Sequence, residues 1–407
     1  MAGPLSGLRV LDFSRILAGP WAAQTMADLG AEVIKIERRG TGDDTRLWGP
    51  PFITAEDGRE IPDAAYFHCA NRGKKSLTLD LASEKGQEIV RRLAATSDIL
   101  VENYKRGGLA RYRLDYESLR AVNPGLVYCS ITGFGQTGPY ADRAGYDFLI
   151  QAMGGLMSIT GERDDLPGGG PQKVGVAVTD VLTGLYTAIA AIAAVRERET
   201  TGQGKHIDMA LFDVAVASTA NQAMNYLVTG EAPGRMGNGH PNVVPYQSFA
   251  TSDGHVVVAV GNDSQFARFC EAGGRPDLAG DERFRTNAGR VEHRDALIPA
   301  LAEMMLARTQ DEWIAALEAV GVPCGPINDL RRIFADPQAE ARGLRMELPH
   351  SEAGSVPGVA NPIRYVGEPH DYPGGAPALG EHTEEVLGGL LGMDEDEIAA
   401  LREDGVV

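Results

Sequence analysis

Residues 7–37, GLRVLDFSRILAGPWAAQTMADLGAEVIKIE, contain an apolar run, a helical stretch and a second apolar run. The apolar runs Gly7–Phe13 and Ala31–Glu37 predict β-strands, and Pro20–Leu29 between them predicts a helix. Two strands joined through a helix are typically parallel, with the helix packed on one face of their sheet. This stretch therefore predicts an α/β fold.

The same alternation continues to about residue 135. Further predicted strands are Ser76–Leu81, Asp98–Asn103 and Leu126–Thr132, and further predicted helices are Glu84–Thr96 and Tyr116–Val122. We therefore expect a Rossmann-like, mostly parallel sheet with helices on its faces. The residues after the first strand, Ser14–Pro20, do not form the glycine-rich GxGxxG fingerprint, which disfavours an ordinary dinucleotide site.

The second half of the chain has a different character, and residues 230–242, rich in Gly, Pro and Asn, mark the boundary. Beyond it we expect a hairpin, formed by Tyr246–Thr251 and His255–Val260, and three helices, over Ser264–Ala272, Arg294–Ala307 and Gln310–Val320. Thr309 and Glu312 form a capping box for the last of these helices. From about Ala341 we expect an irregular chain that ends in a helical region, over Thr383–Leu391 and Asp394–Asp404. The expected domains are a large α/β domain (1–200 with about 341–407), a helical linker (201–229, with a helix over Met209–Leu227) and a smaller α+β domain with its return linker (230–340).

Composition limits the function classes. The chain has 407 residues and a net charge of −18, which disfavours nucleic acid and anionic membranes as partners. No signal peptide is expected at its start, and the uncharged run Val181–Val195 is too short to cross a membrane. The four cysteines are far apart, with no CxxC pair, so we expect neither a structural metal nor disulfides, and a reducing cytoplasm.

Asp180 directly precedes the run Val181–Val195, which predicts a buried helix. A carboxylate at this position has two interpretations that its residue type leaves open. It caps the free N–H groups of the first helical turn, or those groups and the helix dipole keep a nucleophilic carboxylate ionised.

Basic and polar groups follow the predicted strands, at Arg15, Arg38 and the stretch from Asn103 to Arg111. The carboxyl ends of parallel strands are where such sheets bind ligands, so these groups indicate a phosphate site. A solvated basic face is the alternative.

Eight segments in order resemble the class III CoA-transferases, the group of formyl-CoA transferase, carnitine CoA-transferase and 2-methylacyl-CoA racemase. They are Leu17–Glu37, Lys74–Leu81, Ser97–Tyr104, Ile131–Pro139, Gly145–Gly161, Thr201–Asp213, Gly321–Ile327 and Leu379–Val386. The resemblance covers nearly the whole chain. It implies an interlocked homodimer, in which each protomer passes through a ring formed by the other.

The resemblance also implies the reaction. Asp180 matches the family's nucleophile, which would carry CoA from an acyl-CoA, with succinyl-CoA expected, to a small carboxylic or dicarboxylic acid through a mixed anhydride and an aspartyl-CoA thioester. No metal and no permanently bound cofactor are implied, because coenzyme A enters as a substrate. Gly237, Asn238 and Gly239 match the family's mobile glycine loop in a shorter form, and an interdomain linker is the alternative.

Family positions for CoA fall on ten residues, namely Leu17, Ala18, Arg38, Leu79, Asn103, Tyr104, Lys105, Arg111, Tyr146 and Asp147. Leu17 replaces a glutamine and Ala144 a lysine of formyl-CoA transferase, which disfavours formyl-CoA and oxalate as substrates. Racemases of the group carry a Gly-His-Asp segment, whereas this chain has Gly145-Tyr146-Asp147. A tyrosine, with an ordinary pKa of about 10, is a poor base for α-proton exchange, so a transferase is favoured over a racemase or epimerase. A non-catalytic CoA-binding subunit is a third possibility.

Overall fold

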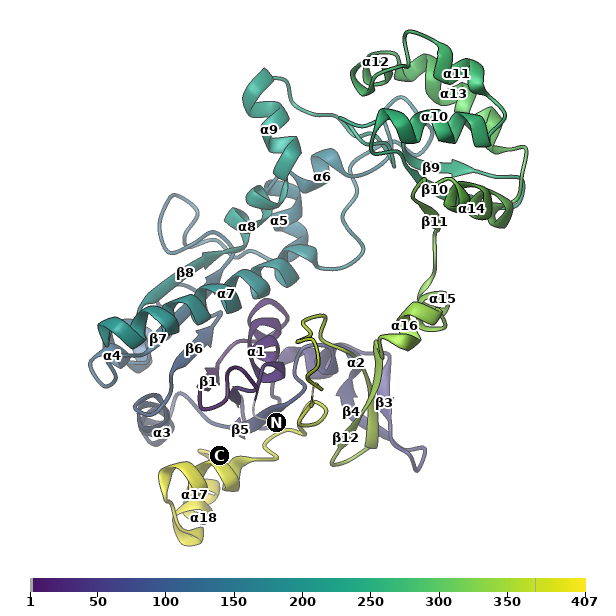
Figure 1. The fold of residues 1–407 in the computed structure, drawn as a ribbon. Coiled ribbons are helices and arrows are strands. Elements are labelled where there is room, and N and C mark those ends of the chain that lie inside the picture. The colour runs from purple at the N-terminus through teal and green to yellow at the C-terminus, as the bar shows by residue number, and fades with distance from the viewer. Residues whose placement is uncertain (1–2, 370) are drawn as a thin grey trace. The chain divides into compact units, whose positions relative to one another are not determined.

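The computed structural model describes residues 3–369 and 371–407. They form two compact units, and we describe each by itself (Figure 1). The first unit contains the described residues up to Leu156, together with Val174–Met224 and Gln338–Val407, and the second contains Met157–Lys173 and Asn225–Pro337. The division differs from the expected one at two places, because residues 157–173 pack with the second unit and most of the predicted linker packs with the first.

A six-stranded parallel sheet organises the first unit. Its strand order is β5 (Lys74–Thr78), β2 (Glu32–Glu37), β1 (Arg9–Asp12), β6 (Ile99–Glu102), β7 (Val127–Thr132) and β8 (His206–Ala210). The predicted parallel α/β sheet is therefore confirmed, and β8 forms one of its edges, where a further strand over Lys205–Asp208 was expected.

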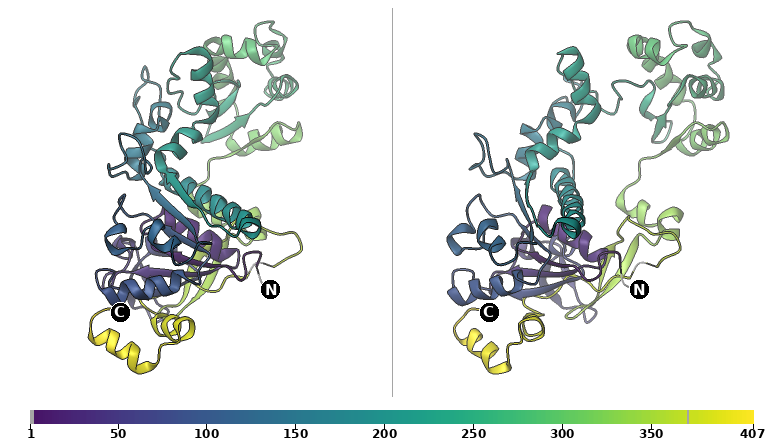
Figure 2. Two further views of the ribbon diagram at one scale, coloured as in Figure 1. Left: turned by 90° about the vertical axis from the view of Figure 1, so that its left-hand side faces the viewer. Right: turned by 60° about the vertical axis from the view of Figure 1, so that its left-hand side comes forward.

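Successive strand residues feed two apolar layers, because neighbouring side chains on a strand point to opposite faces. Val10 and Val33 pack with α1 (Ala18–Asp28) and α7 (Val178–Thr201). Leu11 and Ile34 pack instead with α3 (Glu84–Ala94), α17 (Thr383–Leu391) and α18 (Glu395–Glu403). Figure 2 shows α17 and α18 at the C-terminal end of the chain, within this unit.

Small elements complete the first unit. They are η1 (Asp44–Leu47), β3 (Phe52–Thr54) paired with β4 (Glu60–Ala64), α2 (Ala65–His68), η2 (Ala110–Tyr112), α4 (Tyr116–Arg120), α5 (Asp147–Met153) and α8 (Leu211–Ser218). Three short helices at or across the unit boundaries are α6 (Leu156–Ile159), α9 (Ala220–Thr229) and α16 (Pro337–Ala341).

Two sequence expectations are wrong here. The predicted single helix over Met209–Leu227 is divided into α8 and α9, and Ala220, the first residue of α9, has φ +43°. Ser218 and Thr219 hydroxyls donate to backbone carbonyls of α8, the side-chain competition that favours helix ends.

The stretch after Ala341, predicted to be irregular, instead forms an antiparallel pair, β12 (Arg345–His350) and β13 (Gly354–Val359). Its glycines and prolines weaken the strand signal in the sequence. Leu348 and Val356 are nevertheless buried against Ile53 and Ile61, which stabilises the pair.

The second unit is α+β. Its antiparallel sheet has the order β11 (Cys324–Pro326), β10 (His255–Ala259) and β9 (Tyr246–Ala250). Its helices are α10 (Asp263–Ala272), α11 (Pro276–Gly280), α12 (Asn287–Glu292), α13 (Arg294–Met305), α14 (Gln310–Ala319) and α15 (Leu330–Phe334). The predicted hairpin is confirmed, as is the capping box of Thr309 and Glu312.

The helix α7 is long and apolar enough to cross a membrane by length and composition, and within the described residues it is alone in this. It is longer than the uncharged run had indicated, since it extends to Thr201. Its residues Ala188, Ala191 and Val195 are buried in the core beside the sheet. Such burial is typical of a core helix, for which the same composition is expected.

Candidate active site

Asp180 lies in the first turn of α7, but it is not the N-cap. Ala177 occupies the cap position and offers no side-chain acceptor. Within the described part of the chain, no hydrogen bond or ion pair ends on the Asp180 carboxylate. The capping interpretation is therefore wrong, and so is the idea that first-turn N–H groups hold this carboxylate by hydrogen bonding.

The N–H group of Thr179, in this turn, finds its acceptor on another helix. Thr179 donates from its backbone nitrogen (2.9 Å) and from its hydroxyl (2.5 Å) to Oδ1 of Asp147, the first residue of α5. Thr179 is fully buried and Asp147 is buried. Asp147 was predicted to contact CoA, and the structure places its carboxylate against the start of α7.

The environment makes Asp180 more basic than an ordinary aspartate. Burial, with a smaller contribution from the charge of Asp147, raises the pKa of Asp180 to about 7. Tyr66 of α2 also interacts with this charge, since burial and the charges of Cys69, Asp180 and Asp147 raise the pKa of Tyr66 to about 12. A basic carboxylate suits nucleophilic attack, and a phenol that stays neutral keeps a proton to donate.

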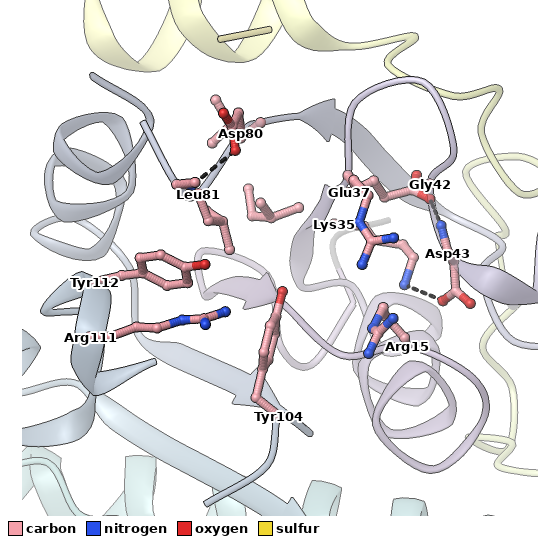
Figure 3. Close-up of a pocket in the computed structure, with 14 residues that line it drawn as sticks. Arg15, Lys35, Glu37, Gly42, Asp43, Asp80, Leu81, Tyr104, Arg111 and Tyr112 are labelled. Carbon is pink, nitrogen blue, oxygen red and sulfur yellow. Dashed lines mark hydrogen bonds and ion pairs between the residues drawn. The ribbon is translucent and has the colours of Figure 1, made fainter. Parts of the chain in front are cut away.

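A cavity of about 160 Å³ opens at the carboxyl ends of β2, β5 and β6 in the first unit (Figure 3). Four of the predicted CoA residues line it, namely Arg38, Leu79, Tyr104 and Arg111. Figure 3 shows Tyr104 and Arg111 on one side of the cavity and Arg15 on the other, where Lys35 points to Asp43. The cavity combines cationic groups with aromatic rings, as an adenine nucleotide requires.

Buried ion pairs support one wall of this cavity. Lys35 is fully buried, with its Nζ 3.0 Å from Asp43 Oδ2 and 2.8 Å from the carbonyl oxygen of Ser14, to which it donates. Lys35 thereby ties β2 to the loop after β1. Arg15, in that loop, forms an ion pair with Asp44 at 2.7 Å and lies 5.8 Å from the ring centre of Tyr104.

The other predicted CoA residues lie outside the cavity lining. Leu17 and Ala18 are buried where α1 begins. Asn103 accepts from the backbone nitrogen of Arg15 (2.9 Å) and donates to its carbonyl oxygen (2.7 Å), so it fixes the loop after β1. Lys105 is exposed, and Tyr146 is 66% exposed immediately before α5.

Sequence reasoning did not select two residues that the structure brings to these sites. Tyr112 lines the cavity, and Tyr66 interacts with Asp180. Arg15, which also lines the cavity, was expected at a phosphate site because it is a basic residue directly after a strand. Tyr66 had none, since it belongs to a one-turn helix in a stretch without a predicted element.

The predicted glycine loop lies in the second unit, where hydrogen bonds order it. Gly237 has φ +56° and donates to the carbonyl oxygen of Gly161 (3.0 Å), and Asn238 donates to Ser248 Oγ (2.9 Å). Gly239 donates to the carbonyl oxygen of Met236 (2.9 Å). Arg294 then holds the following residues, donating to the carbonyl oxygens of His240 (3.2 Å) and Pro241 (2.7 Å).

No group of three or more His, Cys, Asp or Glu side chains able to hold a metal ion occurs among the described residues.

Comparison with known proteins places the whole chain in one family. The sequence profile of CoA-transferase family III matches residues 5–383. The chain is 51% identical to a succinate–glutarate CoA-transferase of Agrobacterium fabrum over 95% of this chain and 96% of that protein. It is 43% identical to the human succinyl-CoA:glutarate CoA-transferase, over 99% of this chain and 90% of the human protein. The crystal structure of a CAIB/BAIF family protein from Brucella suis superposes with a TM-score of 0.83 at 52% identity, covering 96% of this chain and 100% of that one.

Proposed function

The chain belongs to CoA-transferase family III, and from that premise we propose that it transfers CoA from succinyl-CoA to glutarate or a dicarboxylate of similar size. That the protein is a CoA-transferase follows from the family and from relatives that share its full length. The choice of acids is supported by the names of the bacterial and human relatives, both of which use succinate or succinyl-CoA and glutarate. The observation that carries the mechanism is the unpaired, basic carboxylate of Asp180 at the start of α7.

The first half-reaction consumes succinyl-CoA. The ionised Asp180 attacks the thioester carbonyl, and the C–S bond breaks to give a succinyl–aspartyl anhydride and the CoA thiolate. The thiolate then attacks the Asp180 carbonyl of the anhydride, which releases succinate and leaves an aspartyl-CoA thioester. Each step passes through an oxyanion, and Tyr66, whose phenol stays neutral and interacts with the charge of Asp180, is a candidate donor to it.

The second half-reaction reverses these steps with the acceptor. A glutarate carboxylate attacks the aspartyl-CoA thioester and releases the thiolate, which then attacks the glutaryl carbonyl of the new anhydride. Glutaryl-CoA leaves and Asp180 is regenerated as a carboxylate. Because each bond exchanged has similar activation, no other energy source is needed.

The cavity of the first unit would hold the nucleotide end of CoA. Arg38, Arg111 and Arg15 supply charge for its phosphates, and the rings of Tyr104 and Tyr112 supply faces for adenine.

The test is a screen of acids against succinyl-CoA with mass-spectrometric detection of the new acyl-CoA. We expect glutarate and similar dicarboxylates to be the best acceptors and oxalate to be poor. In addition, hydroxylamine should trap wild-type Asp180 after incubation with succinyl-CoA, and Asp180→Ala should lose both trapping and exchange. Exchange at a wild-type rate in Asp180→Ala would refute the nucleophile, and α-proton exchange from deuterated water without an acceptor would indicate a racemase instead.

We also propose that the protein is the interlocked homodimer that its family resemblance implies. Supporting it, α7 keeps apolar side chains on its exposed face, including Leu185, Tyr186 and Ile189, of which Ile189 is 64% exposed. Exposed apolar faces on a core helix are typical of protein interfaces.

A further inference from the structure

The start of α7 poses a capping problem that its own sequence does not solve. The first N–H groups of a helix have no partner inside the helix, and a buried one left unpaired costs free energy. Ala177 has no polar side chain to act as a cap, and Asp180 accepts nothing. Thr179, which is fully buried, donates its N–H to Asp147 Oδ1 at 2.9 Å instead. The cap of α7 therefore comes from α5.

The Asp147 carboxylate also takes part in a second set of hydrogen bonds. Asp147 Oδ2 accepts from Gln151 Nε2 at 2.7 Å, one turn further along α5. Gln151 Oε1 in turn accepts from the backbone nitrogen of Val174 at 2.9 Å. Two residues of α5 thus hold both ends of the stretch from Val174 to Thr179, which leads into the turn that carries Asp180.

We propose that Asp147 is the positioning residue of the nucleophile: it caps α7 from another helix and so fixes the first turn while leaving the Asp180 carboxylate unbonded for attack. This inference rests on the proposed function, in which Asp180 is the nucleophile. It gives the Asp147 side chain a different task from the CoA contact that family resemblance implied. Had Asp180 been its own cap, the hydrogen bonds would have weakened the carboxylate as a nucleophile.

The position of Asp147 has an electrostatic consequence. Its charge helps burial to keep Asp180 basic, and among the described residues Tyr66 is the other titratable group found to interact with Asp180. An uncharged side chain at position 147 should therefore lower the pKa of Asp180, whereas Tyr66 stays neutral across the working range. If Asp147 had only a structural role, replacing it with an uncharged side chain would leave the pKa of Asp180 unchanged.

Four variants separate these effects. Asp147→Asn keeps an oxygen for Thr179 but removes the charge and the acceptor for Gln151, and Asp147→Ala removes all three. Thr179→Val loses only the hydroxyl bond, and Thr179→Ser retains it. The exposed aspartate of the first turn of α8, changed in Asp213→Asn, controls for the loss of one negative charge.

We expect Asp147→Ala to lower kcat by about 100-fold, the order of loss that a small misplacement of a reacting group produces, with KM for succinyl-CoA unchanged. Asp147→Asn should shift the acid limb of the kcat profile to lower pH, and Asp213→Asn should not. Thr179→Val should lower kcat, and Thr179→Ser should restore it to near the wild-type value.

The results that would contradict the role of Asp147 differ from those that would contradict the proposed function. A wild-type acid limb in Asp147→Asn, or a wild-type kcat in Asp147→Ala, overturns the proposal. A rise in KM for succinyl-CoA with unchanged kcat makes Asp147 a CoA contact and overturns it as well. If Asp147→Ala does not fold, the acid limb of Asp147→Asn and the kcat ratio of Thr179→Val to Thr179→Ser decide. Activity in Asp180→Ala would instead refute the proposed function itself.

Discussion

The environment that makes the Asp180 carboxylate reactive also lowers the stability of the folded protein. A half-buried carboxylate that lacks a hydrogen-bond donor is disfavoured when it is ionised, and its partial withdrawal from water together with the charge of Asp147 raises the pKa of Asp180 to about 7. A stronger base makes a better nucleophile, so the unfavourable environment serves the chemistry. The same environment should make the folded protein less stable once the group is ionised.

We therefore expect Asp180→Asn to stabilise the protein in a pH-dependent way. Because the folded-state pKa lies above the value of 3.8 for an ordinary aspartate, the stability of the wild type falls as the pH rises from about 4 to about 7 and then levels off. The variant lacks this term, so its advantage should be small at pH 4 and full at pH 8. Urea unfolding of both proteins at the two values measures the difference.

Asp213→Asn provides the control, since this aspartate occupies the first turn of α8 but is exposed. An equal gain in unfolding free energy for both variants, or a gain for Asp180→Asn that does not change with pH, would contradict the expectation.

At this scale the sequence alone suggested Asp180 only as an acidic residue before an apolar helix, and the family resemblance supplied its role. Its capping partner could not be predicted, because Thr179 and Asp147 are 32 positions apart and meet only when α5 and α7 pack together. Arg38, Leu79, Tyr104 and Arg111 were expected at a CoA site from the family resemblance, and all but Leu79 also because they follow predicted strands; the four do line one cavity. The carboxyl ends of parallel strands lie at one edge of the sheet, so residues that follow them can be grouped from the sequence. Which residues of two helices meet when the helices pack cannot be read from the sequence in this way.

At the scale of elements, local patterns predicted most of the structure. The strands β1, β2 and β6 follow apolar runs, and the capping box of α14 follows from Thr309 and Glu312. The pair β12 and β13 could not be predicted, since its stability comes from contacts with Ile53 and Ile61 that lie far away in the sequence. Tertiary burial there overrides weak strand propensity.

The glycine segment of the second unit permits a prediction about backbone shape. Gly237 has φ +56°, and a Cβ at this position would lie 2.7 Å from Glu162 Oε1. We expect Gly237→Ala to displace the segment, with a local cost of about 1 kcal/mol and a fall in kcat, because the side chain meets both a strained φ and a close neighbour. Steady-state kinetics and thermal unfolding measure the two effects.

Gly234→Ala is the matched control, since Gly234 is three residues away, and a Cβ there meets no atom within 4 Å. Equal kcat values in the two variants would mean that the shape of the segment does not matter for turnover, and the role of Gly237 implied by resemblance would then be lost.

At the scale of the whole molecule, the interlocked topology of the proposed dimer predicts that its protomers do not exchange, which a high affinity between them would not by itself predict. Two protomers held only by a surface exchange partners as the complex dissociates and re-forms. Two interlocked rings cannot part while both remain folded, whatever the free energy of their contact. The exposed apolar face of α7, with Leu185, Tyr186 and Ile189, explains association but not interlocking.

Subunit exchange distinguishes the two cases. When homodimers carrying two different affinity tags are mixed under native conditions, we expect no mixed dimers after prolonged incubation, even at high dilution. After joint unfolding in urea and refolding, mixed dimers should appear in statistical proportions, because the chains then thread at random. Native mass spectrometry measures the proportions of the two homodimers and the mixed dimer. Exchange without unfolding would leave a dimer that is joined only at its surface, and a monomer in light scattering would remove the dimer altogether.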